Sequence, residues 1–250
     1  MRVLYPTIVI LLSLIACGLA TPTPTATPDS SQFYNQGLEY LNNSQYQLAI
    51  EQFNKAAELN PDDSNIYANR GLAHHWLGAY GEASADYGRA LELDPDNYLT
   101  YYNRGVSFGD RGQHERAVAD YRRAIERNPT DPLSHNNLAW GLAYHLDINY
   151  EEALEYALRS VELSPEDYNL DTLALVYYKL ERYEEALEYY NRALALNSSQ
   201  LDSLKGRGDV YLALGSEEAA VKDYEIYLAL APESLERAEV EAKLEMLRAR

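Results

Sequence analysis

The sequence has very little cysteine: Cys17 is the only one among 250 residues. A single cysteine excludes an intrachain disulfide framework and any cysteine-based metal site. Phenylalanine and tryptophan are also scarce, with 3 and 2 residues, whereas tyrosine occurs 23 times. Tyrosine combines an apolar ring with a hydroxyl that needs a polar partner, which suits half-buried helix faces and peptide-binding grooves.

Basic side chains are few, with 21 Lys and Arg against 39 Asp and Glu, so the net charge is −18. Proteins bind nucleic acids largely through Lys and Arg, which release counterions from the phosphates. The charge therefore argues against a nucleic-acid partner. The same net charge is also explained by a solvated surface whose acidic residues make the molecules repel one another and stay soluble.

Recognisable catalytic and metal-binding motifs are absent from the sequence. It contains no glycine-rich phosphate loop, nucleophile elbow or zinc motif. His74 and His75 are adjacent, but neighbouring residues on a helix point about 100° apart and cannot easily share a metal. We therefore expect no enzymatic activity, no cofactor and no metal site.

The N-terminal apolar run is too short to span a membrane. It extends over 8–20, which is 13 residues, whereas a spanning helix needs roughly 20. Following Arg2, it indicates a signal peptide over residues 1–16. The sequence Leu14-Ile15-Ala16-Cys17 resembles the lipobox of bacterial lipoproteins.

That resemblance implies cleavage before Cys17 and lipidation of this residue. The protein would then be anchored by lipid to a membrane of the bacterial cell envelope, in an extracytoplasmic location. Residues 17–29 would then hold the anchor and a spacer, because TPTPTATP at 21–28 favours an extended, polyproline-like chain. The alternative is cleavage after Ala20, a small-x-small site, which would release a soluble periplasmic or secreted protein.

The rest of the chain repeats itself at a spacing of about 34 residues, which indicates a repeat array. Six units align on two small residues and a closing proline: 30–63, 64–97, 98–131, 132–166, 167–200 and 201–234. The first small position holds Gly37, Gly71, Gly105, Ala139, Ala174 and Gly208, and the second holds Ala49, Ala83, Ala117, Ala153, Ala186 and Ala220. Each unit then closes at Pro61, Pro95, Pro129, Pro165, Ser198 or Pro232.

This pattern is similar to the tetratricopeptide repeat (TPR), a helix-turn-helix unit of about 34 residues. The resemblance implies an all-α fold, a right-handed superhelical solenoid of six helix pairs. Residues 235–250 carry one apolar stripe among many charges and predict a C-terminal capping helix, with Ser234 as its N-cap.

Three departures from the pattern carry structural predictions. The fourth unit has two extra residues between Ala139 and Ala153, so its inter-helix turn near 146–150 should bulge. The fifth unit replaces the proline with Asn197-Ser198-Ser199, which can also stop a helix. The sixth has Tyr227 at a position where small residues are usual.

Two positions, one on each expected helix of a unit, vary together between the units. Charged pairs stand in three units, an amide pair in the first, and apolar pairs in the fourth and fifth: Arg70–Asp86, Arg104–Asp120, Arg207–Asp223, Gln36–Gln52, Leu138–Tyr156 and Leu173–Tyr189. We expect the two positions to touch within each helix pair, as an ion pair or hydrogen bond where they are polar.

In the TPR family the first helices line a concave surface that holds extended peptides, and the resemblance implies the same here. The polar ladder on this surface would be Asn35, Asn69, Asn103 and Asn137, and its aromatic side chains Tyr34, Trp76, Tyr102, Trp140, Tyr144, Tyr168 and Tyr178. Asparagine offers paired donors and acceptors to a peptide backbone. The same residues could instead serve packing between repeats.

The sequence therefore predicts a lipid-anchored, extracytoplasmic scaffold that binds extended segments of other proteins. Two alternatives remain open: a glycan or cell-wall binder that stacks sugars on the groove aromatics, and a self-associating structural protein. The family's clamp for C-terminal carboxylates needs lysines in the early units of the groove, and these are absent.

Replacing Cys17 with Ser should move the protein out of the detergent phase of a membrane extract. Acyl chains anchor through about 0.8 kcal/mol per buried CH₂, and two or more chains hold a protein stably. Phase partitioning and intact mass measure the change. A wild-type protein that begins at Thr21 and carries no lipid mass would contradict the prediction.

Overall fold

The computed structural model describes residues 29–231, 233 and 236–249, and these residues are helical with short turns between the helices. The elements are α1 (Ser30–Asn42), α2 (Tyr46–Leu59), α3 (Ser64–Trp76), α4 (Tyr80–Leu93), α5 (Tyr98–Asp110), α6 (His114–Arg127), α7 (Pro132–Trp140), the π-helix η1 (Gly141–Leu146), α8 (Tyr150–Leu163), α9 (Asp167–Lys179), α10 (Tyr183–Leu196), α11 (Leu201–Ala213), α12 (Glu217–Leu230) and α13 (Arg237–Arg248).

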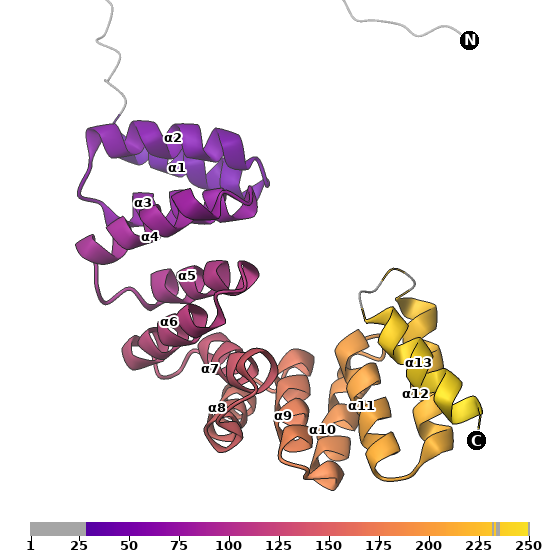
Figure 1. The fold of residues 1–250 in the computed structure, drawn as a ribbon. Coiled ribbons are helices and arrows are strands. Elements are labelled where there is room, and N and C mark those ends of the chain that lie inside the picture. The colour runs from indigo at the N-terminus through magenta and orange to yellow at the C-terminus, as the bar shows by residue number, and fades with distance from the viewer. Residues whose placement is uncertain (1–28, 232, 234–235, 250) are drawn as a thin grey trace, which may run out of the picture.

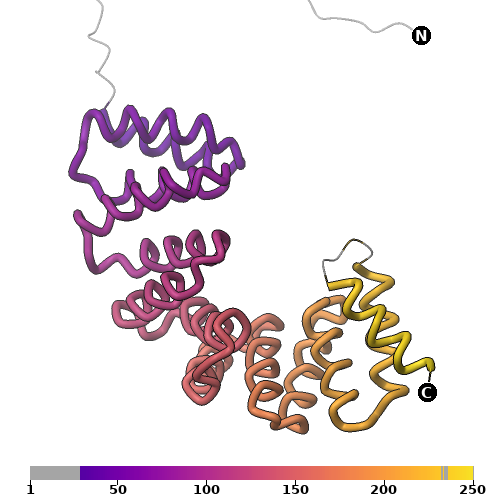
Figure 2. Tube along the Cα trace, in the orientation of Figure 1, coloured from indigo at the N-terminus to yellow at the C-terminus, as the bar shows by residue number. Residues whose placement is uncertain are grey.

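Consecutive helices form six antiparallel pairs, from α1 and α2 to α11 and α12, and each pair packs on the next. Figure 1 and Figure 2 show the pairs following an arc with an open concave side. Helix α13 packs on α12 and closes the C-terminal end of the array. The expected all-α solenoid of six helix pairs with a terminal helix is confirmed.

Local signals explain where the paired helices begin and turn. The carboxylate of Asp131 accepts a hydrogen bond from the backbone N–H of Ser134 at 2.8 Å and caps α7, as Asp and Asn do at helix starts. The turn between α5 and α6 contains Gly112 at φ +70°, a backbone conformation that glycine adopts without steric cost. The corresponding turns place one left-handed residue at Ser44, Gly78, Glu181 and Gly215.

The small residues of the first helices allow an aromatic ring of the second helix to approach closely. A Cβ on Gly105 would lie 2.7 Å from the ring of Tyr121, which is 6% exposed. Such a contact is far inside van der Waals distance, so only glycine fits. In the fourth unit Ala157 takes the place of the ring, and there Ala139 is accommodated, with both alanines fully buried.

The covarying charged pairs form ion pairs, as predicted. Arg104 donates to Asp120 through Nε at 2.7 Å and Nη2 at 2.8 Å. Arg207 makes the same two bonds to Asp223 at 2.7 and 2.8 Å, and Arg70 pairs with Asp86 likewise. Planar guanidinium and carboxylate groups match in this two-bond geometry, which makes such pairs strong.

Two of these arginines also link one repeat to the one before it. Arg70 donates to Asn54 of α2, and Arg207 to Asn191 of α10, each at 2.8 Å. In units four and five, Leu138 and Leu173 are buried in one core cluster, and Tyr156 and Tyr189 pack against that cluster. The prediction for the first unit was wrong: Gln52 is buried while Gln36 is exposed, and no hydrogen bond joins them within the described chain.

The two extra residues of the fourth unit change its first helix as well as its turn. Helix α7 continues into η1, a π-helix, and the turn that follows holds Asp147 and Asn149 in the left-handed conformation. The wider π-helical turn absorbs inserted residues without ending the helix. The bulge predicted near 146–150 is therefore present, and it begins earlier, at Gly141.

The other two departures behave as follows. Helix α10 ends at Leu196, and the side chain of Asn197 accepts hydrogen bonds from the backbone and hydroxyl of Ser199. Tyr227 is 1% exposed and packs in the C-terminal core cluster.

The terminal helix begins at Arg237 rather than at residue 235. The predicted cap Ser234, the signal segment, Cys17 and the spacer over 21–28 lie outside the described residues.

Asp120→Ala should destabilise the protein by about 3 kcal/mol, because it leaves Arg104 partly buried without its charge partner. Asp110→Ala is the matched control, since that carboxylate is 50% exposed, and should change stability by less than about 1 kcal/mol. Urea unfolding measures both.

The double variant Arg104→Leu/Asp120→Tyr copies the apolar pairs of units four and five, and should recover part of the loss. Single-variant effects that simply add in the double variant would show that the two positions do not interact.

Candidate functional site

The predicted groove residues all lie on first helices or on η1. Tyr34 and Asn35 are on α1, Asn69 and Trp76 on α3, Tyr102 and Asn103 on α5, Asn137 and Trp140 on α7, Tyr144 on η1, and Tyr168 and Tyr178 on α9. They do not form one continuous site. Tyr34, Asn69, Trp76, Tyr102 and Asn137 make contacts between repeats, and Trp140, Tyr144 and Tyr178 line a cavity in the C-terminal half. Asn35, Asn103 and Tyr168 belong to neither group.

Two of the ladder asparagines bind tyrosines of the preceding repeat. Asn69 Nδ2 donates to the hydroxyl of Tyr34 at 3.1 Å and to its own helix at 2.9 Å. Asn137 Nδ2 donates to the hydroxyl of Tyr102 at 3.4 Å. Asn103 differs, because Ala68 stands where the tyrosine would be. The amide groups of Asn69 and Asn137 thus contribute to repeat packing.

The two tryptophans have different surroundings. Trp76 is 59% exposed and stacks on Tyr46, with ring centroids 6.2 Å apart. Trp140 is 37% exposed and stacks on Tyr144 at 5.0 Å, with the ring planes 6° apart. The edge of His145 also contacts Trp140, at 4.3 Å between centroids. Trp76 also contacts His75, at 5.2 Å between centroids, so the two tryptophans have similar ring contacts and differ in that Trp140 is less exposed.

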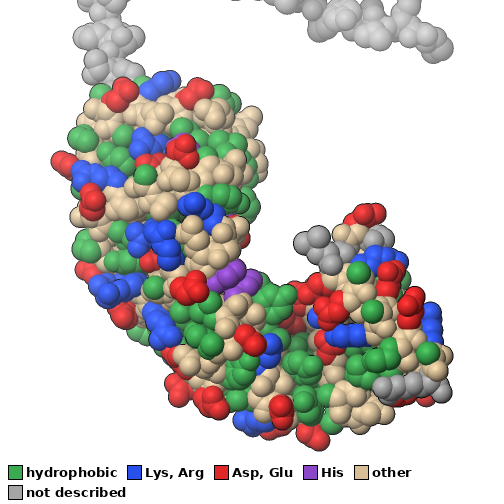
Figure 3. All heavy atoms as spheres, viewed as in Figure 1, with side chains coloured by type: hydrophobic (Ala, Val, Ile, Leu, Met, Phe, Trp, Pro, Cys, Tyr) green, Lys and Arg blue, Asp and Glu red, His purple; other side chains and the backbone are tan. Residues whose placement is uncertain are grey.

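A histidine pair that the sequence pattern did not reveal lies beside Trp140. The rings of His114 and His145 stack with centroids 3.8 Å apart. Figure 3 shows histidine gathered on the inner side of the bend of the array. Burial, followed by the nearby His114, lowers the pKa of His145. The two rings line a cavity of about 280 Å³ together with Asp110, Asn137 and Trp140.

A second concave cavity, of about 230 Å³, lies between α7, η1, α9 and α11. We call it the acidic–aromatic cavity. It brings together three of the predicted groove residues with six charged side chains that sequence analysis did not select. Its lining is Trp140, Tyr144, Asp171, Leu175, Tyr178, Lys179, Tyr190, Asp202, Lys205, Gly206, Asp209 and Glu236.

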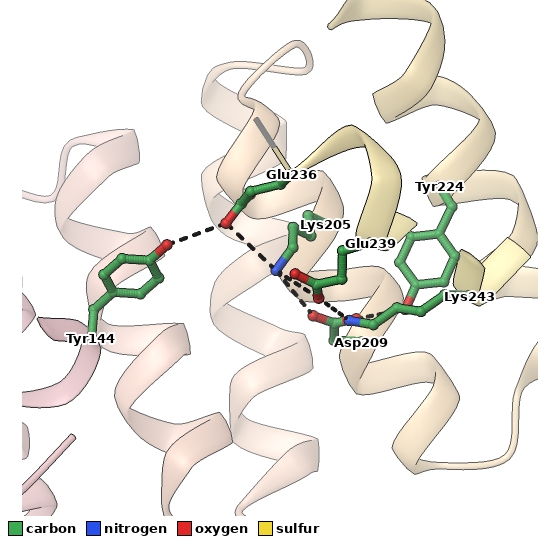
Figure 4. A network of polar contacts seen from close by, with 7 residues as sticks. All are labelled: Tyr144, Lys205, Asp209, Tyr224, Glu236, Glu239 and Lys243. Atoms are coloured by element: carbon green, nitrogen blue, oxygen red, sulfur yellow. Dashed lines mark hydrogen bonds and ion pairs between the residues drawn. The ribbon is translucent and has the colours of Figure 1, made fainter. Parts of the chain in front are cut away.

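A polar network crosses the mouth of this cavity and joins residues far apart in sequence (Figure 4). The hydroxyl of Tyr144 donates to Glu236 at 3.2 Å. Lys205 lies 3.9 Å from Glu236 and 3.6 Å from Asp209. Lys243 of α13 then contacts Asp209 at 2.6 Å. The network ties the middle of the array to its terminal helix.

The same network has two further members, on α12 and α13. Glu239 contacts Lys205 at 3.6 Å and Lys243 at 2.7 Å, and Tyr224 donates to Asp209 at 2.6 Å. Asp209 therefore receives a phenol and two lysines, so its charge is well compensated. Burial lowers the pKa of Lys205, but Asp209, Glu236 and Glu239 outweigh it and raise that pKa overall.

One carboxylate in the acidic–aromatic cavity has no such compensation. Asp171 is 8% exposed, and its only hydrogen bond within the described chain comes from the hydroxyl of Ser203 at 2.5 Å. The pKa of Asp171 is raised to about 7, mainly by burial; the hydrogen bond from Ser203 opposes this rise, and the charges of Asp202 and Asp167 add to it. Near neutral pH this group therefore exchanges between its protonated and ionised forms.

The floor of the cavity depends on a glycine in the ladder position of the sixth unit. The ring of Tyr190 lies directly against Gly206, so that any Cβ there would overlap the hydroxyl. The small position of the fifth unit carries a Cβ, at Ala174, where four other units have glycine. The ring of Tyr190 thus packs toward the next repeat, against Gly206. At this ladder position the surface is therefore an aromatic ring, where earlier units present an asparagine side chain.

Sequence reasoning found three of the four aromatic residues of the cavity, and missed Tyr190 and the acidic half. Trp140, Tyr144 and Tyr178 were expected in a groove, and they share one cavity. The acidic residues lie at unrelated repeat positions, so no periodic signal marks them. The signal that could have found them is local: acidic side chains on α9 and α11 that face the concave side.

No group of three or more metal-ligating side chains lies together among the residues that the structure places. His74 and His75 contact different carboxylates, at 3.8 Å from Asp86 and 3.6 Å from Asp110.

Asp171→Asn should stabilise the protein at pH 8 and have little effect at pH 4. The folded-state pKa of about 7 lies above the ordinary value of 3.8, so ionisation opposes folding increasingly from pH 4 to 7 and fully above it. The gain at pH 8 should be on the order of a few kcal/mol. The amide oxygen can still accept from Ser203.

Thermal or urea unfolding at each pH measures the difference between wild type and variant, which cancels the titration of other groups. Asp96→Asn, at an exposed loop carboxylate, is the control and should show no such trend. A stability difference for Asp171→Asn that is equal at pH 4 and pH 8 would contradict the assignment.

Comparison with known proteins agrees with the fold. Models of the tetratricopeptide repeat match residues 64–97 and 98–131, 172–234, and 37–78, which together cover more than half of the chain. No curated protein matches the sequence.

Solved structures are similar at low identity. The Cut9–Hcn1 hetero-tetramer of the APC/C matches with a TM-score of 0.73 and 19% identity over 88% of this chain, which spans 42% of that one. PilF of Pseudomonas aeruginosa matches with a TM-score of 0.72 and 21% identity over 86% of this chain and 97% of that one. YrrB, described as a TPR protein with an unusual peptide-binding site, matches with a TM-score of 0.62 and 20% identity. The match covers 76% of this chain and 97% of that one. The repeat models and the six helix pairs together show that this chain belongs to the tetratricopeptide repeat family.

Proposed function

We propose that this chain is a non-catalytic scaffold that binds an extended segment of another protein along its concave surface. TPR proteins generally mediate protein–protein interactions. The observation that carries the proposal is the acidic–aromatic cavity, which lies on the concave side and has exposed aromatic side chains at its edge. Concave sites with aromatic walls and a few convergent polar groups are typical of binding sites.

The C-terminal half of the array is the proposed binding region. There Trp140, Tyr144 and Tyr168 are 37%, 46% and 39% exposed, so a ligand can bury substantial aromatic surface. In the N-terminal half, the amide of Asn69 already bonds to Tyr34, and Trp76, although 59% exposed, is not among the residues that line the acidic–aromatic cavity. A bound segment would therefore make its main contacts over units four to six.

The glycan alternative needs open aromatic faces on which a sugar can stack. One face of Trp140 is covered by Tyr144, and the edge of His145 also contacts the ring. That face of Trp140 is therefore closed to a stacking sugar. We therefore propose the peptide ligand, and the experiment below separates the two.

We further propose that the scaffold is held at a membrane of the bacterial cell envelope by lipid on Cys17. The support is the lipobox-like sequence at the end of an apolar run. Within the part of the chain that the structure describes, no helix is long and apolar enough to cross a membrane. The proline-rich spacer would hold the array away from the lipid surface.

Photo-crosslinking in cells tests the binding surface. Benzoylphenylalanine in place of Tyr168, on the concave surface, should give covalent adducts with a partner protein. The matched control is the same residue in place of Leu158, which is 42% exposed on the second helix of the fourth unit. It should give at least about tenfold less of that adduct.

Peptide mapping of the adduct then identifies the ligand. A single short stretch of the partner supports binding of an extended segment. Adducts with the mass of a glycan support the cell-wall alternative, and adducts with a second copy of this chain support self-association. Equal adducts from positions 158 and 168 would overturn the concave site.

A further inference from the structure

The charges around the acidic–aromatic cavity do not cancel. Four carboxylates line it, at Asp171, Asp202, Asp209 and Glu236, against the two ammonium groups of Lys179 and Lys205. The whole chain adds a long-range negative potential, since its net charge is −18. A cation is therefore attracted to this cavity both locally and from a distance.

Both lysines at the cavity already have carboxylate partners. Lys179 contacts Asp147 at 2.5 Å, outside the cavity lining. Lys205 is shared among Asp209, Glu236 and Glu239, and Lys243 compensates Asp209 as well. Lys179 is thus held by Asp147 and Lys205 by the network, so neither lysine forms an ion pair with Asp171 or Asp202 in the described residues.

Two carboxylates remain without a cationic partner. The buried side chain of Asp171 bonds only to Ser203 through one oxygen, Oδ1. Asp202 is exposed and makes no ion pair or hydrogen bond to any other residue in the described ranges. Partial desolvation, followed by the charge of Glu236, raises its pKa, and the charge of Lys205 acts in the opposite direction. Of the two, Asp171 is buried, and a buried carboxylate without a counter-charge is costly, so a ligand that supplies the charge to Asp171 gains that free energy.

The remaining walls are aromatic, at Trp140, Tyr144, Tyr178 and Tyr190. Aromatic faces and carboxylates together favour organic cations over metal ions, because the rings attract a diffuse, weakly hydrated charge. A guanidinium fits best, since it is planar, stacks on rings and binds carboxylates through two parallel hydrogen bonds.

We infer that the acidic–aromatic cavity takes a basic side chain, arginine in preference to lysine, of the extended segment bound on the concave surface. The inference rests on the proposed function and specifies its ligand. Asp171 and Asp202 supply the charge, and the rings of Trp140, Tyr144 and Tyr178 surround the aliphatic stem and the cationic head.

The protonation of Asp171 couples this binding to pH. Its pKa is raised to about 7 by burial, and a bound cation favours the ionised form. The groups that face it are Ser203 and Asp202 of α11, Asp167 of its own helix and Tyr190 of α10. Binding should therefore strengthen from pH 6 to pH 8 and release a proton when the cation enters below pH 7.

A titration followed by NMR tests the inference on the full-length protein. The chain has two tryptophans, and the variant Trp76→Phe assigns the indole N–H signal of Trp140. The probes are N-acetyl-arginine amide, N-acetyl-lysine amide, the neutral isostere N-acetyl-citrulline amide, and alanine amide, which carries a free α-amine. The arginine probe should shift the Trp140 signal saturably, and the citrulline probe should bind at least tenfold more weakly.

Variants separate the cavity from general attraction by the acidic surface. Asp171→Asn/Asp202→Asn should weaken the arginine probe at least tenfold. The matched control Asp62→Asn/Asp96→Asn removes two charges at carboxylates 82% and 81% exposed, and should change binding less than twofold. In Asp171→Asn alone, the increase in affinity from pH 6 to pH 8 should largely disappear.

Three results would overturn the inference: equal shifts from the arginine and citrulline probes, equal weakening in the cavity and control variants, or binding of alanine amide as strong as that of the arginine probe. The last would assign the cavity to a chain end instead of a side chain. Failure here is distinguishable from failure of the proposed function. If the partner segment still crosslinks at position 168 after every basic residue in that segment is replaced, this inference is refuted and the proposed function stands.

Discussion

The whole array depends on how closely the two helices of each pair approach. In four units a glycine of the first helix lies under an aromatic ring of the second, at Gly37, Gly71, Gly105 and Gly208. Burying such a ring is worth about 1.5–3 kcal/mol, and the contact fixes the pair as one rigid block. No pair can bury its outer face alone, so stacking on the next pair supplies the remaining stability.

Departures from this packing produce the site. The fourth unit has Ala157 in place of the ring and two extra residues, which continue its first helix into η1 and place Tyr144 where it reaches Glu236. In the fifth unit the ring of Tyr190 packs against Gly206 of the sixth. The acidic–aromatic cavity forms where these irregular units meet. Sites at which regular packing is interrupted are common places for function.

The charged residues divide into two groups with different physical roles. The arginine–aspartate pairs within units are fully matched, with two hydrogen bonds each, and they hold the helix pairs together. In the cavity, by contrast, neither Asp171 nor Asp202 forms an ion pair among the described residues, although the charge of Lys205 acts on Asp202. Matched pairs serve the fold, whereas the unmatched carboxylates are available to a ligand.

The sequence by itself determined the all-α array, its six units, the arginine–aspartate pairs within units and the irregular fourth unit. These follow from periodic small residues and from matched chemistry at two positions, which are local or repeat with a constant spacing. Trp140, Tyr144 and Tyr178 could be selected for the same reason, since they lie on first helices or on the η1 continuation, whereas Tyr190 lies on a second helix and was missed. Only the tertiary structure decided that Asn69 and Asn137 bind tyrosines of preceding repeats, and that the early groove residues do not join the cavity. It also decided which acidic side chains lose water and which find a lysine. The reason is that the cavity assembles residues from 140 to 236 across several helix pairs, and the degree of burial of a carboxylate depends on those distant neighbours.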